Sequence, residues 1–238
     1  MCNRFDLSKI ANFVKKSIMR FHPVGHRLII ASLVILSIVN VLLYFLSPTI
    51  YLWLILFVAP SLVLVFLIFR FFRYPHRIPL EVSEKTVLAP ADGKVVVIEQ
   101  VHDDRFIKGD AIQISTFMSA HNVHLNWVPI DANATELVYL PGKYLLARNP
   151  KSSMLNEMSC VLFTTKDGQK VVVKQIAGAM ARRVIPFLNQ GDDYKRGDEL
   201  GFIRFGSRVD VLLPLGSKIM VKLGDKPKGL RTVLAELP

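Results

Sequence analysis

A glycine–serine pair near the C-terminus, Gly206-Ser207, is the stretch of this chain with the clearest chemical potential. Strand-like runs flank it on both sides, at Phe202–Phe205 and Arg208–Leu213. A serine hydroxyl is a poor nucleophile by itself and needs a neighbouring base, which a third group orients. Glycine has no side chain to obstruct attack on its carbonyl, and it tolerates unusual backbone angles. The pair is therefore a candidate reaction centre if the chain also supplies a base and an orienting acid.

Two stretches supply residues of these types. Asp92 lies in Ala89–Val95, where an Asp-Gly pair before a valine run is also typical of a turn that feeds a strand. His124 lies in His121–Trp127, and in a strand His121 would point to the face opposite His124. Taken alone, a strand histidine of this kind is more often a satisfied structural residue than a base. The spacing of these residues does not by itself join them to Ser207.

The other residues able to do chemistry are two arginines and two cysteines. Arg182 and Arg183 are adjacent; such pairs are usually solvated, but they can bind a phosphate through paired, charge-assisted hydrogen bonds. Cys2 and Cys160 have no CxxC spacing, so they predict neither a disulfide framework nor a metal site. Their sparse use suits a reducing cytoplasm.

A long uncharged segment must anchor the chain in a membrane. No Lys, Arg, Asp, Glu or His occurs in Leu28–Phe69, about twice the roughly 20 apolar residues that one span needs. Proline in Ser47–Thr49 breaks the run. We predict a transmembrane helical hairpin with spans Leu28–Leu46 and Ile50–Phe69. A buried hairpin of a soluble protein is the alternative, which so long an uncharged run disfavours.

Charge predicts how this anchor is oriented. The formal net charge is +11, and the arm 1–27 and the residues after the second span, including Arg70, Arg73 and Arg77, are basic. The positive-inside rule therefore places both termini, and the soluble part, on the cytoplasmic side of the inner membrane. An anionic membrane is the partner that this charge favours, and nucleic acid is not expected.

The remainder of the chain predicts one mainly-β domain over 73–238, after the basic arm 1–27 and the hairpin 28–72. Short β-rich runs alternate there with Gly, Pro, Asp and Asn turns, and Lys166–Gln169 is a strong hairpin signal. The rhythm of Lys195–Gly201 and Pro214–Ile219 is typical of barrel-sandwich domains. A helix near Ala177–Phe187 is conceivable, although a glycine and a proline weaken it.

Together these stretches resemble the phosphatidylserine decarboxylase proenzymes. The match to that family's self-cleavage site is in Arg204–Asp210, which reads RFGSRVD, and weaker matches are Ala89–Val95 and Val123-His124, in the same order and spacing. The resemblance covers roughly 75–238 and is nearest the short, membrane-anchored bacterial form. Many relatives carry Ser or Thr after the cleaved Gly-Ser pair, whereas this chain has Arg208, which we interpret as a subfamily mark.

The resemblance implies an enzyme that makes its own prosthetic group. By position, Asp92 orients His124, which activates Ser207 to attack the carbonyl of Gly206. The chain is then cut into a β-chain, 1–206, and an α-chain, 207–238, that stay together, and Ser207 becomes a covalent pyruvoyl group (bound pyruvate). The implied reaction converts phosphatidylserine to phosphatidylethanolamine.

The resemblance also suggests which residues meet the phospholipid. His121 matches a second histidine that some family members carry three residues before the catalytic one, and we keep it as a weaker candidate for substrate binding. Arg182 and Arg183 are candidates for the phosphodiester. No metal is implied, and a homo-oligomer is compatible with the sequence but not indicated by it.

Two other functions compete with this interpretation. A membrane-anchored serine hydrolase would use Ser207 without cutting the chain, but the sequence lacks GxSxG and its β-rich pattern does not suit an α/β-hydrolase. A non-enzymatic, membrane-tethered barrel-sandwich adaptor would explain the turn–strand rhythm, but no carrier lysine stands in an obvious exposed hairpin. Self-cleavage separates the three, because a hydrolase or an adaptor would remain one chain.

Overall fold

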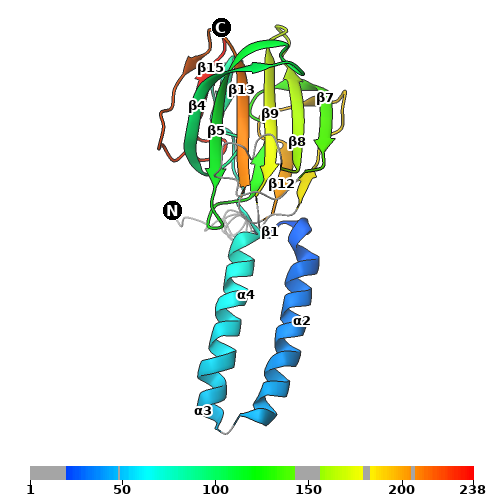
Figure 1. The fold of residues 1–238 in the computed structure, drawn as a ribbon, viewed down its shortest axis with the longest axis vertical. Coiled ribbons are helices and arrows are strands. Elements are labelled where there is room, and N and C mark those ends of the chain that lie inside the picture. The colour runs from blue at the N-terminus through cyan, green and yellow to red at the C-terminus, as the bar shows by residue number, and fades with distance from the viewer. Residues whose placement is uncertain (1–19, 48, 143–155, 179–182, 205–206) are drawn as a thin grey trace, which may run out of the picture. The chain divides into compact units, whose positions relative to one another are not determined.

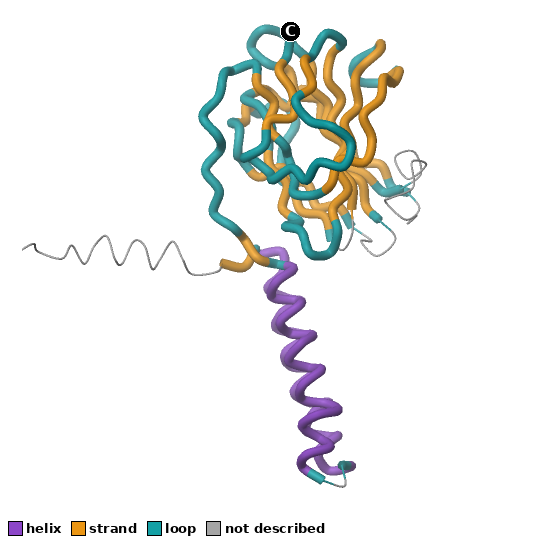
Figure 2. Tube along the Cα trace, turned by 90° about the vertical axis from the view of Figure 1, so that its left-hand side faces the viewer, coloured by secondary structure: helices purple, strands orange, loops and turns teal. Residues whose placement is uncertain are grey.

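The computed structural model describes residues 20–47, 49–142, 156–178, 183–204 and 207–238. The chain divides into two compact units, Met1–His76 and Arg77–Pro238. Figure 1 labels their elements, and Figure 2 shows helix in the first unit and almost only strand and loop in the second. The mainly-β character and the preceding helical pair are therefore as the sequence predicts.

The first unit is a pair of apolar helices. Helix α2 spans Pro23–Leu46, and the second helix runs through α3 (Ile50–Trp53), the π-helical turn η1 (Leu54–Val58) and α4 (Ala59–Phe71). Helix α2 begins five residues before the predicted span, because His22 accepts a hydrogen bond from the Val24 amide and proline suits the first helical position.

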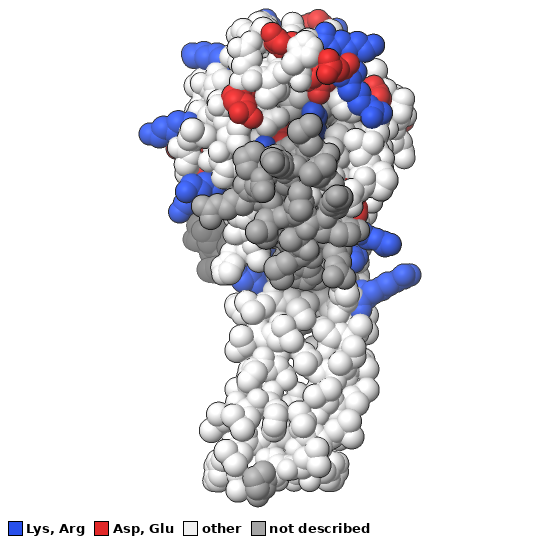
Figure 3. All heavy atoms as spheres, viewed as in Figure 1, with Lys and Arg blue, Asp and Glu red and all other residues white. Residues whose placement is uncertain are grey.

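Both helices are long and apolar enough to cross a membrane. They contain 24 and 22 residues. In the 18-residue apolar stretch of each helix, at most 6% of the residues are buried. At about 1.5 Å per residue each exceeds the roughly 30 Å hydrocarbon core of a bilayer. The middle of the pair carries neither basic nor acidic colour in Figure 3. A core helix of a soluble protein would be covered, so this exposure favours lipid as the solvent of both helices.

Three polar side chains join the two helices. Asn40 Nδ2 donates to Ser61 Oγ at 2.8 Å, and Trp53 Nε1 donates to the Asn40 carbonyl oxygen at 2.9 Å. Hydrogen bonds of this kind hold helices together where no hydrophobic effect is available between them. The π-helical turn ends just before the Ala59-Pro60 step, where proline removes one backbone donor. Short strands β1 (Arg20–Phe21) and β2 (Arg73–Tyr74) pair across the ends of the hairpin.

The second unit is built from three antiparallel sheets. The largest has seven strands in the order β11-β7-β8-β9-β13-β5-β4, and the others are β10-β12-β6 and β14-β15-β3. The strands are β3 (Thr86–Leu88), β4 (Lys94–Asp103), β5 (Gly109–Met118), β6 (Leu125–Trp127), β7 (Ala132–Leu140), β8 (Met158–Thr164), β9 (Lys170–Ala177), β10 (Val184–Pro186), β11 (Asp193–Tyr194), β12 (Glu199–Ile203), β13 (Ser207–Pro214), β14 (Lys218–Ile219) and β15 (Val233–Glu236).

One apolar core joins the three sheets. It contains side chains from one face of the large sheet, such as Ile114 and Val211, together with Leu200 of β12 and Leu234 of β15. The opposite face of the large sheet carries a second, smaller cluster that includes Leu212. Burial on both faces explains why β13 reads as a nearly continuous buried run rather than a simple alternation of polar and apolar residues.

Two local predictions have different outcomes. The Lys166–Gln169 hairpin is confirmed: β8 and β9 pair antiparallel across it, and Gly168 has the positive φ of +76° that such a turn favours. The helix suggested near Ala177–Phe187 is wrong for the described residues, because Ala177 ends β9 and Val184–Pro186 forms β10. β10 pairs with β12, and this tertiary pairing outweighs the weak helical pattern.

Asp103 at the end of β4 predicts a pH-dependent loss of stability. Burial alone would raise its pKa, but hydrogen bonds from Lys174 and from the Ile107 and Phe106 amides outweigh burial, so the pKa lies below its ordinary value. The stabilisation is therefore present at neutral pH and is lost as pH falls below about 4, through the depressed pKa.

We expect Asp103→Asn to lower the melting temperature at pH 7, with a difference from the parent protein that narrows towards about pH 3. Thermal unfolding in detergent across that pH range measures it. Asp104→Asn is the matched control, because the neighbouring Asp104 side chain is 94% exposed. A difference that stays constant across the range would contradict the assignment.

Candidate active site

Ser207 is the first residue of the central strand β13, between β5 and β9 (Figure 1). Its Cα partners are Met118 on β5 and Ala177 on β9, and its side chain is completely buried. The hydroxyl donates to Met118 Sδ at 3.3 Å. Because a thioether sulfur is a weak acceptor, this contact orients the Oγ atom without engaging it in a strong hydrogen bond.

His124 lies beside the strand that leads to Ser207. Its carbonyl oxygen accepts from the Ile203 amide at 3.2 Å, at the end of β12, and its side chain is fully buried. Nδ1 is 3.0 Å from the carbonyl oxygen of Asn122. A carbonyl can only accept, so Nδ1 is the donor in this contact, and in the neutral imidazole the nitrogen without a proton is Nε2. The arrangement leaves Nε2 as the basic atom.

His121 and His124 both precede the strand β6 rather than lying within it. β6 begins only at Leu125, because Asn122 closes a turn in which its Oδ1 accepts from both the amide and the hydroxyl of Ser119. His121 lies in this turn and its side chain is exposed. The two histidines therefore differ in environment: one is inside the domain and the other is at its surface.

A buried polar chain continues from the serine. Met118 Sδ also accepts from Asn126 Nδ2 at 3.5 Å, and Asn126 Oδ1 accepts from Gln175 Nε2 at 2.8 Å. Sequence reasoning missed Met118 and Gln175 as site residues. The only signal for Asn126 was its position two residues after His124, on the same face of an extended chain.

Asp92 is held next to this region from a third direction. The Trp127 amide donates to the Pro90 carbonyl at 2.9 Å, and the Leu88 amide donates to the Pro129 carbonyl at 3.0 Å. This antiparallel pairing sets the segment before Asp92 beside β6, the strand that follows His124. The carboxylate itself accepts from Arg77 and from the Gly229 amide.

Gly93 explains the Asp-Gly pair by close approach rather than by a positive φ. A Cβ atom at this position would lie 2.3 Å from the Phe117 carbonyl oxygen and 2.6 Å from Thr116 Cγ2. Only glycine lets this segment lie against the end of β5, one residue from Met118. The Asp92 segment, β5 and the start of β13 therefore meet at one place.

Arg77 is a site residue that sequence reasoning placed at the membrane interface. Nη2 donates to Asp92 Oδ2 at 2.7 Å, and Nη1 bonds Asp92 Oδ1 and the Gly229 carbonyl oxygen. The guanidinium carbon stands 4.9 Å from the centre of the Trp127 ring. A fork-shaped, delocalised cation suits both contacts at once. Among the described residues the Asp92 carboxylate bonds Arg77 and the Gly229 amide, so the orienting bond from Asp92 to His124 stays a prediction.

Two of the three candidate substrate-binding residues, His121 and Arg183, are described, and both lie at the surface. Arg183 is exposed, and its carbonyl oxygen accepts from the Arg204 amide at 3.3 Å, close in sequence to the Gly-Ser pair. His121 is exposed three residues after Met118. Arg182 and Gly206 lie outside the described residues.

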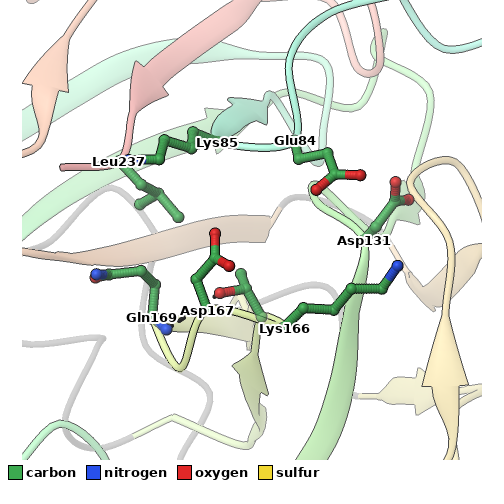
Figure 4. A pocket seen from close by; sticks show the side chains of 8 residues that line it. Glu84, Lys85, Asp131, Lys166, Asp167, Gln169 and Leu237 are labelled. Carbon is green, nitrogen blue, oxygen red and sulfur yellow. Dashed lines mark hydrogen bonds between the residues drawn. The ribbon is translucent and has the colours of Figure 1, made fainter.

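A small cavity elsewhere is not part of this site. It measures about 40 Å³ and lies at the β8–β9 hairpin, beside the first residues of β9. The other end of β9, at Ala177 next to Ser207, is roughly 23 Å away. Figure 4 shows acidic and basic side chains around it, and its lining is Glu84, Lys85, Asp131, Thr165, Lys166, Asp167, Gln169 and Leu237. Its volume suits one water molecule rather than a phospholipid headgroup.

These features define a class of protein. An apolar helical pair precedes a mainly-β domain that buries a serine after a glycine, a histidine and an arginine-paired carboxylate. The sequence model described as phosphatidylserine decarboxylase matches residues 64–235.

Individual proteins agree with that match. The protein named phosphatidylserine decarboxylase proenzyme in Bacteroides fragilis is 41% identical over 220 residues, which cover 92% of this chain and 96% of its own. The protein of that name in Porphyromonas gingivalis is 42% identical over 198 residues, covering 83% and 89%. That of Amoebophilus asiaticus is 45% identical over 170 residues, covering 71% and 75%. The chain belongs to the phosphatidylserine decarboxylase family.

The Arg77–Asp92 pair gives a testable consequence. In Arg77→Met the carboxylate would lose its guanidinium partner and keep only the Gly229 amide, so its side chain should turn. We expect self-cleavage to slow by about tenfold or more, because misplacing a group that supports the reaction is costly. Conversion of the full-length chain, followed by gel and intact mass, measures this. Arg231→Met, the same exchange at an exposed arginine two residues after Gly229, is the control, and equal rates in both variants would contradict the assignment.

Cys160 gives a second prediction. Burial raises the pKa of its thiol to about 11. At pH 8 only about one thiol in a thousand would be ionised, and access is blocked as well. In a Cys2→Ser background we expect the folded protein to resist maleimide and the unfolded protein to react fully. Fast labelling of the folded protein would show that the thiol is accessible and reactive.

Proposed function

We propose that this protein is a membrane-bound decarboxylase that converts phosphatidylserine to phosphatidylethanolamine with a pyruvoyl group made from its own Ser207. Membership of the family supports the reaction. The single structural observation that carries the proposal is the burial of Ser207 at the start of β13, a strand paired on both of its edges. A surface serine would have no comparable shelter from water.

Self-cleavage requires the serine oxygen to replace the nitrogen of its own peptide bond. His124 Nε2 takes the proton of Ser207 Oγ, which attacks the Gly206 carbonyl, and the amide nitrogen of residue 207 then leaves, so the peptide becomes an ester. A base removes the Cα proton of residue 207, and the Gly206 carboxylate leaves. Water hydrolyses the resulting enamine, through its imine form, and ammonia departs. One water is consumed in all.

Asp92 has an electrostatic role in this proposal. The imidazolium that forms at His124 needs a nearby anion, and we assign that role to the Asp92 carboxylate, because the segment before it pairs with the strand that follows His124. Arg77 and the Gly229 amide hold the carboxylate in place. The Asn122 carbonyl fixes the starting tautomer, a task for which sequence reasoning had named only Asp92.

The surroundings of residue 207 fit a pyruvoyl group. The group keeps the α- and β-carbons of the serine and loses its hydroxyl and its nitrogen, so it needs no additional space. Its neighbour Met118 is apolar, with a sulfur that makes no strong demand for a hydrogen-bond donor. When formed, the group supplies an electron sink for the electrons released as carbon dioxide leaves the substrate amine.

This chain's own residues must then bind the headgroup and return a proton. His124 is the first candidate to protonate the carbon that lost carbon dioxide, and the exposed His121 is the second. Arg183, and Arg182 beside it in sequence, are candidates for the phosphodiester.

The apolar helices fit association with a membrane, where the acyl chains of the substrate lie. From the charge flanking them we propose an inner-membrane protein whose catalytic domain faces the cytoplasm and whose basic residues meet anionic lipid. The cut β-chain and α-chain would remain together, since β13 is paired on both sides with strands of the β-chain. The hydrolase and adaptor functions gain no support from the family.

Ser207→Ala should remain one full-length chain without decarboxylase activity, because no hydroxyl is available to form the ester. The parent protein should separate into chains 1–206 and 207–238, the smaller one lighter than its serine form by the mass of ammonia and reactive with a carbonyl-trapping amine. Intact mass with and without the trap measures both. A cut and active Ser207→Ala protein would overturn the proposal.

His124→Ala and Asp92→Asn should each fold and yet cut themselves at least about 100-fold more slowly than the parent chain, since each removes a part of the base. The fraction cut over time after cell-free synthesis gives the rate. His121→Ala is the matched control for His124, and it should be cut at the parent rate. Normal processing of both His124→Ala and Asp92→Asn would remove the proposed base and its partner.

A further inference from the structure

Arg208, the residue directly after Ser207, is buried. Only 2% of its side chain is exposed, although it is among the largest residues in the chain and carries a positive charge. Removing such an ion from water costs several kcal/mol. A buried cation one residue from the proposed cut therefore needs a physical reason.

The guanidinium of Arg208 has two strong partners. Nε donates to Asp210 Oδ1 at 2.6 Å, and Nη2 donates to Ser115 Oγ at 2.7 Å. Asp210 is on the same strand and is completely buried, while Ser115 is on the neighbouring strand β5. The side chain therefore ties the beginning of β13 to β5, the strand that also carries Met118.

This network lies behind the reactive residue. Successive side chains of a strand point to opposite faces, so Ser207 faces the core shared by the three sheets, as Val209 does. Arg208 and Asp210 face the other side, with Leu212 and its apolar cluster. The anchor can thus hold the backbone of residue 207 without occupying the reaction space.

Stability alone does not account for the network. Arg208 Nη1 has no hydrogen-bond partner among the described residues, and an incompletely satisfied buried ion pair is often no better than apolar residues of similar volume. In the uncut chain, the start of β13 is also held by its covalent link to residue 206. The cut would remove that link and turn residue 207 into a chain end, where strands commonly fray.

We infer that Arg208, with Asp210 and Ser115, is a positioning device that keeps residue 207 in register with Met118 and Ala177 after the cut. The inference rests on the proposed function, since it concerns the pyruvoyl end that only a cut chain has. It assigns Arg208 no contact with the substrate. Its role is to fix where the end of the α-chain stands.

The test is a double variant, Arg208→Met with Asp210→Leu. It replaces both charges by apolar groups, so neither ion is left buried alone. We expect it to cut itself and to react with the carbonyl trap as the parent does. Turnover per trapped carbonyl should fall by about 10-fold to 100-fold with KM unchanged, as for a reacting group that is misplaced but still reached by its substrate.

Amide hydrogen exchange, measured before and after the cut, separates a positioning role from a purely structural one. A purely structural role would change exchange equally in the cut and the uncut chain. In the cut double variant, the amides of residues 208–211 should exchange faster than in the cut parent. On a Ser207→Ala background the chain stays continuous, so the same two substitutions should leave these amides as protected as in Ser207→Ala alone. Leu212→Ala is the matched control: it weakens the same strand and face, and should lower stability while turnover per carbonyl stays at the parent value.

A milder variant keeps the experiment decisive if the double variant does not fold. Arg208→Lys retains a charge for Asp210 but lacks the fork that also reaches Ser115. We expect normal cutting and a smaller loss of turnover per carbonyl, with faster exchange only after the cut.

Two results would overturn the inference. One is parent-like turnover per carbonyl together with unchanged exchange in the cut variants. The other is failure of a folded double variant to cut, since the network would then act before the cut. Failure of the proposed function looks different, because the parent protein itself would stay uncut and carry no reactive carbonyl.

Discussion

The pairing of β13 on both of its edges is the constraint on which the rest of this structure depends. Its first residue, Ser207, is fixed by Met118 of β5 on one side and by Ala177 of β9 on the other. Backbone hydrogen bonds to two neighbours hold a strand far better than a loop would be held. A reactive residue can therefore stand at a chain break, provided that the break is at the start of this strand and not within it.

Close packing of backbones brings the other groups to that strand. Gly93 lies against β5, and a Cβ atom on Gly229 would lie 2.5 Å from the Trp127 ring. Gly201 has the same role beside Gln175, whose side-chain oxygen would be 2.7 Å from an added Cβ. These glycines serve proximity rather than unusual φ, and they let Asp92 and His124 be buried, Asp92 with hydrogen bonds from Arg77 and the Gly229 amide and His124 with one to the Asn122 carbonyl.

The helical unit and the β unit differ in the surroundings that their residues require. The helices expose apolar side chains, whereas the β unit buries its apolar side chains in a core. Helical backbone hydrogen bonding suits lipid, and Asn40 places its polar side chain against Ser61 of the other helix. In the β domain water is excluded by three sheets around one core. A phospholipid substrate needs both environments, because its acyl chains remain in lipid while its headgroup must react where water does not compete.

The sequence by itself determined the elements with strong local or compositional signals. The uncharged Leu28–Phe69 run predicted a pair of apolar helices, the Lys166–Gln169 stretch had the residues of a hairpin turn, and the RFGSRVD stretch pointed to the family. Only the tertiary structure decided that Arg77, which follows the second apolar helix in the chain, pairs with Asp92. It also decided that Arg208 is buried with Asp210 and Ser115. An arginine near a membrane or in a strand looks the same in sequence whether it is solvated or buried. Its environment is set by strands far away in the chain, whose register no local pattern records.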